Sequence, residues 1–251
     1  MDLHASPPPN PTPTAGTSRR VVLVHGAWHG GWCWRRVAPG LAARGLDVHT
    51  PTLAGLGDRA HLVSPAIGLA THVEDVLAYL YHADLEDVLL VGHSYAGLVV
   101  REAADRAPGR VGAVALIDAW VGEDGASLAD LAPPWFMDAL RGSAASSGFG
   151  WLCPPPTADL LGVTAGDDVA WLAAHLVAHP LGTFEDRTRL AGRVASLPHH
   201  AAVCAEGMGL PFGEMAAVVG CPSPVVLPSG HDAMVVAPDA VADFVAGAAA
   251  V

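Results

Sequence analysis

The amino-acid sequence predicts an α/β fold in which a mainly parallel sheet carries helices on both faces. Segments typical of strands alternate strictly with segments typical of helices as far as Ile117. The strand segments, such as Val21–His25, are short apolar runs rich in β-branched residues, with no alternation of apolar and polar positions. This pattern is typical of parallel strands, which are buried on both faces. Strict alternation of strand and helix favours helices packed on the two faces of one sheet.

The elements before residue 120 are predicted in this order. Four strands are expected, at Val21–His25, Leu46–Thr50, Asp87–Val91 and Val111–Ile117. Helices are expected between them, at Trp32–Arg44, from Thr71 onward and at Tyr95–Arg106. The second helix is predicted from the capping-box spacing of Thr71 and Glu74, which apolar residues at helical period follow.

The alternation stops after the fourth strand. Residues 120–195 contain helical pieces and turn-rich linkers, and we predict no strand there. The helical pieces are Ser127–Leu140 and Asp167–His179, and the irregular stretches are Ser143–Gly150 and Cys153–Pro156. The sheet pattern resumes at Ala201–Cys204 and Pro224–Leu227, and a last helix runs from Asp239.

We therefore predict three parts. Residues 21–119 and 196–251 form the core, and residues 120–195 form a helical lid above the carboxyl ends of the strands, where ligands bind in open parallel sheets. Residues 1–20 hold five prolines and no apolar signal segment, so we expect a disordered tail and a cytoplasmic protein.

Composition excludes several classes of function. The chain has 251 residues, of which 51% are hydrophobic and 15% charged, which is typical of one globular domain without a membrane span. The net charge of −12 argues against a nucleic-acid partner. The chain contains no lysine, which excludes Schiff-base chemistry and a Walker-type phosphate loop. Four cysteines without C-x-x-C spacing indicate reduced core residues.

Ser94 is the predicted nucleophile. It lies between a buried strand and a helix, with Gly92 two residues before it and Ala96 two residues after it. This arrangement fits the nucleophile elbow, although Ala96 replaces the last glycine of G-x-S-x-G. The alternative is a serine that caps the helix in an ordinary strand-to-helix turn.

His231 is the predicted base, because a serine hydroxyl is a poor nucleophile until a base removes its proton. It lies on a loop after the last predicted strand, and the alternative is a solvated loop histidine. An oxyanion also needs hydrogen-bond donors. The first strand runs into His25-Gly26-Ala27-Trp28, so the amides of Ala27 and Tyr95 are the predicted pair.

Three motifs together resemble a branch of the α/β hydrolases that contains plant methylesterases, salicylate-binding esterases and hydroxynitrile lyases, with bacterial relatives. The motifs are His25-Gly26-Ala27-Trp28-His29-Gly30-Gly31-Trp32-Cys33-Trp34, Gly92-His93-Ser94-Tyr95 and Gly230-His231-Asp232-Ala233-Met234. The resemblance covers the chain from about residue 20 to its end. It implies the α/β-hydrolase fold, an esterase-type triad, a helical cap and no cofactor.

Two positions separate the alternatives within that branch. The rubber-tree type of hydroxynitrile lyase carries threonine where this chain has Gly26, and lysine where it has Asp232. Both lyase residues are missing, which favours ester hydrolysis.

The triad acid has two candidates. Asp118 ends the fourth strand, and Glu206 follows the strand Ala201–Cys204. The plant enzymes carry the acid after the later strand, which favours Glu206 by position, but the local match there is imperfect. We choose Asp118 and keep Glu206 as the alternative. Asp232 adjoins His231 and is not expected to reach around that ring.

The predicted function is a serine hydrolase that cleaves a carboxylic ester of a small hydrophobic or aromatic molecule. The predicted pocket residues are aromatic side chains and one histidine near the motifs and in the lid: Trp28, His29, Trp135, Phe136 and Trp151. The alternatives are a lyase or cyclase that uses the same triad, and a small-molecule receptor without turnover.

Two further motifs are not expected to bind a nucleotide or a metal, and the first is expected to form a substrate-side loop. Gly55-Leu56-Gly57-Asp58-Arg59-Ala60 stands too far from its strand to bind a dinucleotide. His199, His200 and Cys204 do not predict a metal site, because adjacent strand residues point in opposite directions. We expect no metal and no cofactor. The sequence specifies neither the oligomeric state nor the substrate.

Overall fold

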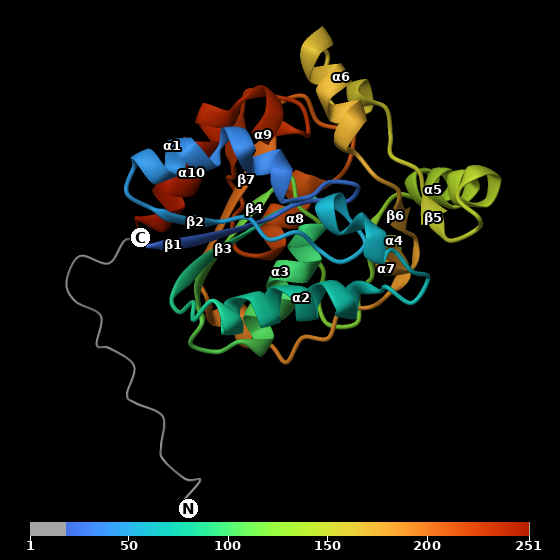
Figure 1. Cartoon of the computed structure of the whole chain (residues 1–251). Coiled ribbons are helices and arrows are strands. Elements are labelled where there is room, and N and C mark those ends of the chain that lie inside the picture. Colours follow the sequence, from blue (N-terminus) through green and yellow to red (C-terminus); the bar gives the residue numbers. More distant parts are fainter. Residues whose placement is uncertain (1–18, 251) are drawn as a thin grey trace, which may run out of the picture.

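Six parallel strands form the central sheet of the protein (Figure 1), in the spatial order β2-β1-β3-β4-β7-β8. The computed structural model describes residues 19–250. The strands have these bounds: β1 (Arg20–Val24), β2 (Asp47–His49), β3 (Val88–His93), β4 (Val111–Ile117), β7 (His199–Cys204) and β8 (Val225–Leu227). The predicted parallel α/β sheet is confirmed. Of the predicted tail, residues 1–18 lie outside the described residues, and Arg20 already belongs to β1.

Helices cover both faces of this sheet (Figure 1). One face packs against α2 (Leu69–His82), α3 (Ala96–Arg106) and α8 (Phe212–Val218), and the other against α1 (Ala38–Ala43), α9 (Ala233–Val236) and α10 (Pro238–Ala249). Side chains alternate between these layers along each strand, as strand geometry requires. In β1, Val22 and Val24 enter the first layer, and Val21 and Leu23 enter the second.

Two predicted helices have different bounds in the structure. The predicted helix Trp32–Arg44 is divided into the 3-10 helix η1 (Gly31–Arg36) and α1, because Pro39 has no amide hydrogen and belongs to the first turn of a new helix. Helix α2 begins at Leu69, two residues before the predicted start. Thr71 occupies the third helical position, and its hydroxyl accepts a hydrogen bond from the Gly68 amide.

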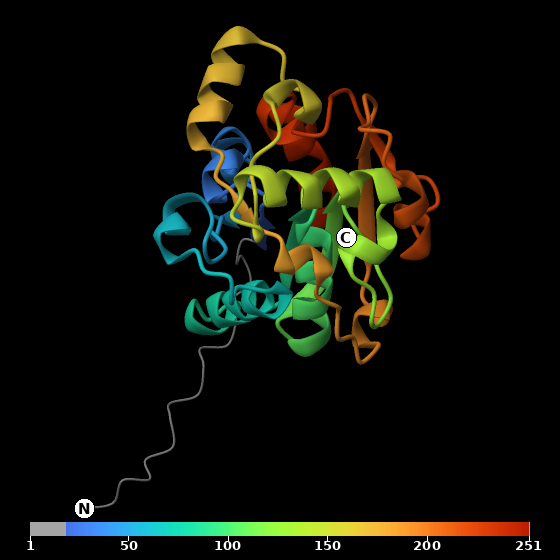
Figure 2. The same cartoon turned by 90° about the vertical axis from the view of Figure 1, so that its right-hand side faces the viewer.

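Residues 120–195, here called the inserted segment, contribute no strand to the six-stranded sheet. Most of the segment lies beyond the carboxyl ends of the strands in Figure 1, and α5 (Pro134–Ser147) runs across that edge in Figure 2. Its helices are α4 (Leu128–Leu131), α5 (Pro134–Ser147), η3 (Ala158–Leu161), α6 (Gly166–His175), α7 (Gly182–Glu185) and η4 (Arg193–Ser196). Another 3-10 helix, η2 (Gly57–Leu62), precedes α2.

The predicted elements of the inserted segment need three corrections. Helix α5 continues to Ser147, so the first part of the stretch predicted as irregular is helical, and the Ser146 and Ser147 hydroxyls donate to the Ser143 carbonyl. Helix α6 ends at His175 because the chain extends beyond it, where the Val177 amide donates to the Trp28 carbonyl. The prediction of no strand is wrong: β5 (Leu152–Cys153) and β6 (His179–Pro180) form a short antiparallel pair, too short to give a periodic pattern.

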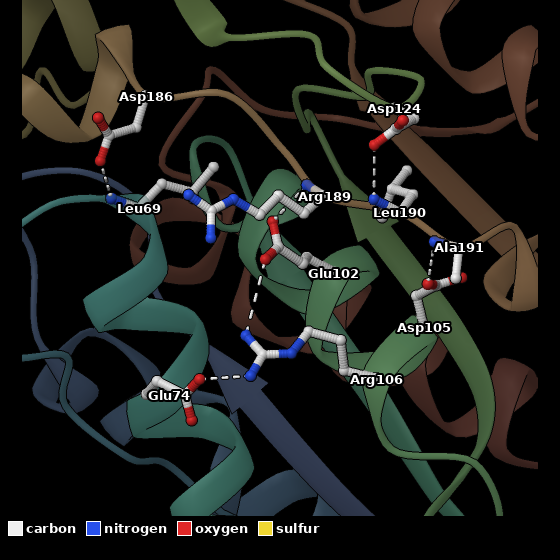
Figure 3. A network of polar contacts seen from close by, with 10 residues as sticks. All are labelled: Leu69, Glu74, Glu102, Asp105, Arg106, Asp124, Asp186, Arg189, Leu190 and Ala191. Atoms are coloured by element: carbon white, nitrogen blue, oxygen red, sulfur yellow. Dashed lines mark hydrogen bonds and ion pairs between the residues drawn. The ribbon is translucent and has the colours of Figure 1, made fainter.

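Two carboxylates of the core and one of the inserted segment itself hold the end of this segment (Figure 3). Three consecutive amides, of Arg189, Leu190 and Ala191, donate to carboxylates of Glu102, Asp124 and Asp105 respectively, at 3.0, 2.8 and 2.5 Å. Glu102 and Asp105 belong to α3, so the segment returns to the sheet along that helix. Among the residues described, no helix combines the length and apolar character needed to cross a membrane.

Candidate active site

The residues predicted for catalysis follow four parallel strands. Ala27 follows β1, Ser94 follows β3, Asp118 follows β4 and His231 follows β8. Carboxyl ends of parallel strands meet at one edge of the sheet, which is where such folds place their ligands. The sheet therefore brings to one edge side chains that are far apart in the sequence.

Ser94 occupies a sharp turn between β3 and α3. Its φ of 54° lies in the left-handed region, which is strained for a serine. The turn is held by the Ser94 amide, which donates to the Ile117 carbonyl at 3.1 Å, and by the Ser94 carbonyl, which accepts from the Trp120 amide at 3.0 Å. A Cβ atom at Gly92 would lie 2.7 Å from Val100 Cγ2, so the neighbouring positions require small residues. This geometry is that of the expected elbow.

His231 is oriented by Asp118. The two atoms His231 Nδ1 and Asp118 Oδ2 are 3.0 Å apart, and both residues are buried, at 4% and 1% exposure. An ionised carboxylate only accepts hydrogen bonds, so Nδ1 carries the proton and Nε2 of the neutral ring has a free lone pair. The second carboxylate oxygen, Oδ1, accepts from the Cys204 amide at 2.8 Å.

The charge on Asp118 is maintained despite burial. Burial alone would raise the pKa of Asp118, but the hydrogen bond and charge of His231 and the Cys204 amide together lower it. The alternative acid, Glu206, has an exposed side chain, and its amide donates to the Ser229 carbonyl at 3.0 Å. Within residues 19–250 its carboxylate forms no hydrogen bond with His231.

His93 links the turn at Ser94 to His231. Its ring lies 4.6 Å from the His231 ring, centroid to centroid, and its Nε2–H donates to the His231 carbonyl at 3.0 Å. Burial lowers the pKa of His93 to about 3, so this ring is neutral. The Phe212 ring stacks on the His231 ring, and the angle between the two ring planes is 11°. Sequence reasoning missed both contacts, although His93 stands in the motif beside Ser94.

The predicted oxyanion turn lies directly against Ser94. A Cβ atom at Gly26 would lie 2.9 Å from Ser94 Cβ, so a side chain at this position would require the neighbouring turn to shift. Neither the Ala27 amide nor the Tyr95 amide donates a hydrogen bond to another group within the described residues. Trp28, which follows, has a φ of 66°. Two free amides therefore flank the serine.

The predicted pocket residues differ in their surroundings. Trp28 is buried, and its Nε1–H donates to the Cys153 carbonyl at 3.0 Å. His29 is 1% exposed with both ring nitrogens engaged, so it has no polar atom left for a substrate. Phe136 packs 5.8 Å from Trp120, whereas Trp135 is 56% exposed and Trp151 is partly buried. Trp28 is thus enclosed by the fold, Phe136 and Trp151 are partly buried, and Trp135 is exposed.

Other aromatic residues, which sequence reasoning missed, lie near the base. Trp120 packs edge-on against Phe212 with ring centroids 5.3 Å apart, and Phe212 in turn stacks on His231. Their signal in the sequence was weak, because neither residue belongs to a motif. In the part of the chain that the structure describes, no three His, Cys, Asp or Glu side chains are arranged to hold a metal ion.

Known proteins resemble this chain over most of its length. Residues 21–244 match the alpha/beta hydrolase family. The carbendazim hydrolyzing esterase of Nocardioides sp. (strain SG-4G) is 38% identical over 237 residues, which cover 90% of this chain and 97% of that protein. Methylesterase 3 of Arabidopsis thaliana is 34% identical over 125 residues, which cover 49% of this chain and 46% of that protein.

A solved structure shares the fold over nearly the whole chain. An extracellular α/β-hydrolase from a Paenibacillus species, described as structurally and functionally homologous to tobacco salicylic acid binding protein 2, matches with a TM-score of 0.80. The match has 22% identity and covers 92% of this chain and 98% of that chain. The chain therefore belongs to the α/β-hydrolase family, in the branch of the plant methylesterases and their bacterial relatives.

Proposed function

We propose that this chain hydrolyses a carboxylic ester of a small hydrophobic or aromatic molecule through an acyl-enzyme on Ser94. The observation that carries the proposal is the buried His231, held by Asp118 at 3.0 Å and in ring contact with the neighbour of Ser94. Its relatives, an esterase and methylesterases, support the predicted class of carboxylic-ester hydrolase. They favour neither the lyase nor the receptor alternative.

The reaction has two halves. His231 Nε2 takes the Ser94 proton while the hydroxyl oxygen attacks the ester carbonyl, and the amides of Ala27 and Tyr95 stabilise the oxyanion. The imidazolium, stabilised by Asp118, then protonates the leaving alcohol as the carbon–oxygen bond breaks. A water molecule, deprotonated by the same nitrogen, attacks the acyl group. The acid is released, and Ser94 regains its proton from His231.

The surroundings of the base indicate the substrate class. Phe212 and Trp120 form an apolar aromatic wall beside His231, and Trp28 follows the oxyanion turn. Apolar walls with few polar groups select hydrophobic or aromatic molecules. The bacterial relative is named for hydrolysing carbendazim. Carbendazim and aryl methyl esters are therefore the first compounds to test.

We also propose that the inserted segment acts as a lid. Ser94 and His231 are 7% and 4% exposed, so the surrounding chain covers most of both residues. The inserted segment lies at that edge of the sheet (Figure 2) and is the natural candidate.

The test is Ser94→Ala, assayed on p-nitrophenyl and aryl esters. We expect loss of turnover with an unchanged far-UV spectrum, and loss of labelling by a fluorophosphonate probe. Ser146→Ala, at an exposed position on α5, is the matched control and should retain full activity. Mass spectrometry with a slow ester should find the acyl group on Ser94. Turnover that survives Ser94→Ala would remove the serine from the mechanism.

A further inference from the structure

A second histidine–aspartate pair lies behind the oxyanion turn. His29 Nε2 and Asp232 Oδ2 are 3.0 Å apart, and the residues are 1% and 0% exposed. His29 Nδ1 lies 2.6 Å from the Ala27 carbonyl oxygen. The other carboxylate oxygen of Asp232, Oδ1, is buried without a hydrogen-bond partner among residues 19–250. His29 is thus the main hydrogen-bonded partner of a fully buried carboxylate.

The hydrogen bonds determine how many protons the pair holds. A carbonyl oxygen only accepts, so His29 Nδ1 carries a proton and donates it to Ala27. The contact between Nε2 and Asp232 then needs a second proton, which makes His29 an imidazolium beside a carboxylate. The pair is neutral as a whole, which is the condition under which buried charges are tolerated.

This pair holds one side of a strained peptide. The peptide between Ala27 and Trp28 has its carbonyl bound by His29, while its Trp28 amide donates to His179 Nδ1 at 3.3 Å. Trp28 has a φ of 66°, which a side chain other than glycine adopts only when its surroundings enforce it. The two histidines together fix the turn that carries the Ala27 amide.

The same pair joins the turn to the base. Asp232 follows His231 directly, and its amide donates to the Leu161 carbonyl at 2.9 Å. The bond between His29 and Asp232 therefore connects the loop of the predicted oxyanion donor with the loop of the predicted base. A displacement of either loop changes the distance between the two catalytic groups.

We propose that His29 and Asp232 form a positioning pair. The pair fixes the Ala27 amide relative to His231, and because its two charges cancel, it leaves no net charge beside His231. This inference rests on the ester hydrolysis proposed above. Neither side chain touches the reacting atoms in the proposed mechanism. Their effect is on the geometry and charge around those atoms.

The ionisation of the pair agrees with this role. Burial alone would lower the pKa of His29, but the charge and hydrogen bond of Asp232 raise it. Burial alone would raise the pKa of Asp232, but His29 lowers it. Four other ionisable groups beside the pair keep a constant charge near neutral pH. They are His25 and His93, whose pKa values burial lowers to about 3, His179, whose pKa burial lowers well below its ordinary value, and Cys33, whose pKa burial raises.

Three variants test the proposal. His29→Gln removes the bond to Ala27 and leaves the Asp232 carboxylate without its counter-charge. Asp232→Asn keeps a hydrogen-bond donor for a neutral His29, so the bond to Ala27 persists and no charge is left alone. The double variant His29→Gln/Asp232→Asn removes the bond to Ala27 but restores neutrality. His175→Gln is the matched control, because the rings of His175 and His29 both contact the Trp32 ring. The distance between ring centroids is 5.1 Å for His175 and 5.4 Å for His29.

The expected results separate geometry from charge. In His29→Gln, kcat should fall about 10- to 100-fold with KM within about threefold, since a misplaced oxyanion donor weakens only the transition state. The acid limb of its kcat/KM profile should move up by about one pH unit, because the lone carboxylate stabilises the protonated base. Asp232→Asn should keep that limb in place and lose less than about fivefold in kcat. The double variant should return the limb to its place while kcat stays low.

Several outcomes would overturn the proposal. One is a folded His29→Gln whose kcat lies within about threefold of the unchanged enzyme and of His175→Gln. Another is a rise in KM at constant kcat, or an acid limb that moves equally in His29→Gln and Asp232→Asn. If His29→Gln does not fold, the double variant, which has no unpaired charge, decides the question: a kcat equal to that of Asp232→Asn refutes the positioning role.

The Ser94→Ala variant, run in the same assay, separates this inference from the proposed function. An active Ser94→Ala overturns the function itself. An inactive Ser94→Ala together with a fully active His29→Gln overturns only the positioning pair.

Discussion

We expect the substitution Asp118→Asn to lower kcat, because it changes the hydrogen bonds that orient His231. Asp118 contacts two groups: Oδ1 accepts from the Cys204 amide at 2.8 Å, and Oδ2 accepts from His231 Nδ1 at 3.0 Å. The introduced amide has one acceptor and one donor end. Its oxygen must face the Cys204 amide, because two N–H groups cannot face each other. Its NH₂ group therefore faces His231.

That orientation selects the wrong tautomer of the base. An NH₂ group beside Nδ1 requires a lone pair on Nδ1, which moves the ring proton to Nε2, the atom that must accept the Ser94 proton. Loss of the correct tautomer with intact geometry lowers kcat about 10⁴-fold in serine proteases. At 1.36 kcal/mol for each factor of ten, this corresponds to about 5.4 kcal/mol of transition-state stabilisation.

The assay is the steady-state hydrolysis of a p-nitrophenyl ester, together with the rate of fluorophosphonate labelling. Both rates should fall by a similar factor, since both need an activated Ser94. Glu206→Gln, which changes an exposed carboxylate in the same way, should remain within about twofold of the original rate. A kcat for Asp118→Asn within tenfold of the unchanged enzyme would refute the tautomer argument. A large loss in Glu206→Gln would transfer the acid role to that residue.

Three further predictions concern strain, space and acid stability. Ser94→Gly relieves the φ of 54° and should unfold in urea with a free energy about 1 kcal/mol higher than Ser94→Ala; equal values would argue against strain. Gly26→Ala places a Cβ atom 2.9 Å from Ser94 Cβ and should lower kcat about 100-fold in the ester assay, so an unchanged kcat would contradict the close approach. Burial would raise the pKa of Asp105, but hydrogen bonds from the Val194 and Ala191 amides lower it. The ionised Asp105 therefore stabilises the folded state above the ordinary carboxylate pKa, and this contribution is lost as the pH falls through the folded-state pKa. Asp105→Asn should flatten the decline of Tm between about pH 5 and about pH 3, and an unchanged decline would refute this.

The sequence predicted the sheet because buried parallel strands leave a clear pattern. β4 has the predicted bounds, and the strands around Ser94 and His231 differ from the prediction by a few residues. The pattern was weaker where short-range contacts decide the structure. Pro39 divided a predicted helix, and the two-residue pairing of β5 with β6 has no periodicity to read.

The candidate site was predictable as far as each residue carried a local signal. Ser94 follows a buried strand and has small neighbours, and His231 stands on the loop after the last strand. The choice between Asp118 and Glu206 depends on which carboxylate turns toward the imidazole, and that is a property of the folded sheet. The ring contacts of His93 and Phe212 with His231 likewise depend on packing between segments distant in the sequence.

The inserted segment leaves β4 and rejoins the sheet at β7, and these two strands are neighbours, with Ile117 paired to Ala202. The two strands are parallel, so the segment leaves at the carboxyl end of β4 and returns to the amino end of β7, and the core fixes both of these points whatever lies between them. Closing a longer or shorter excursion costs little additional entropy. Chimeras that exchange residues 120–195 among relatives are therefore expected to keep the core folded and to transfer substrate preference. Asp118, which lies two residues before the inserted segment, must be retained.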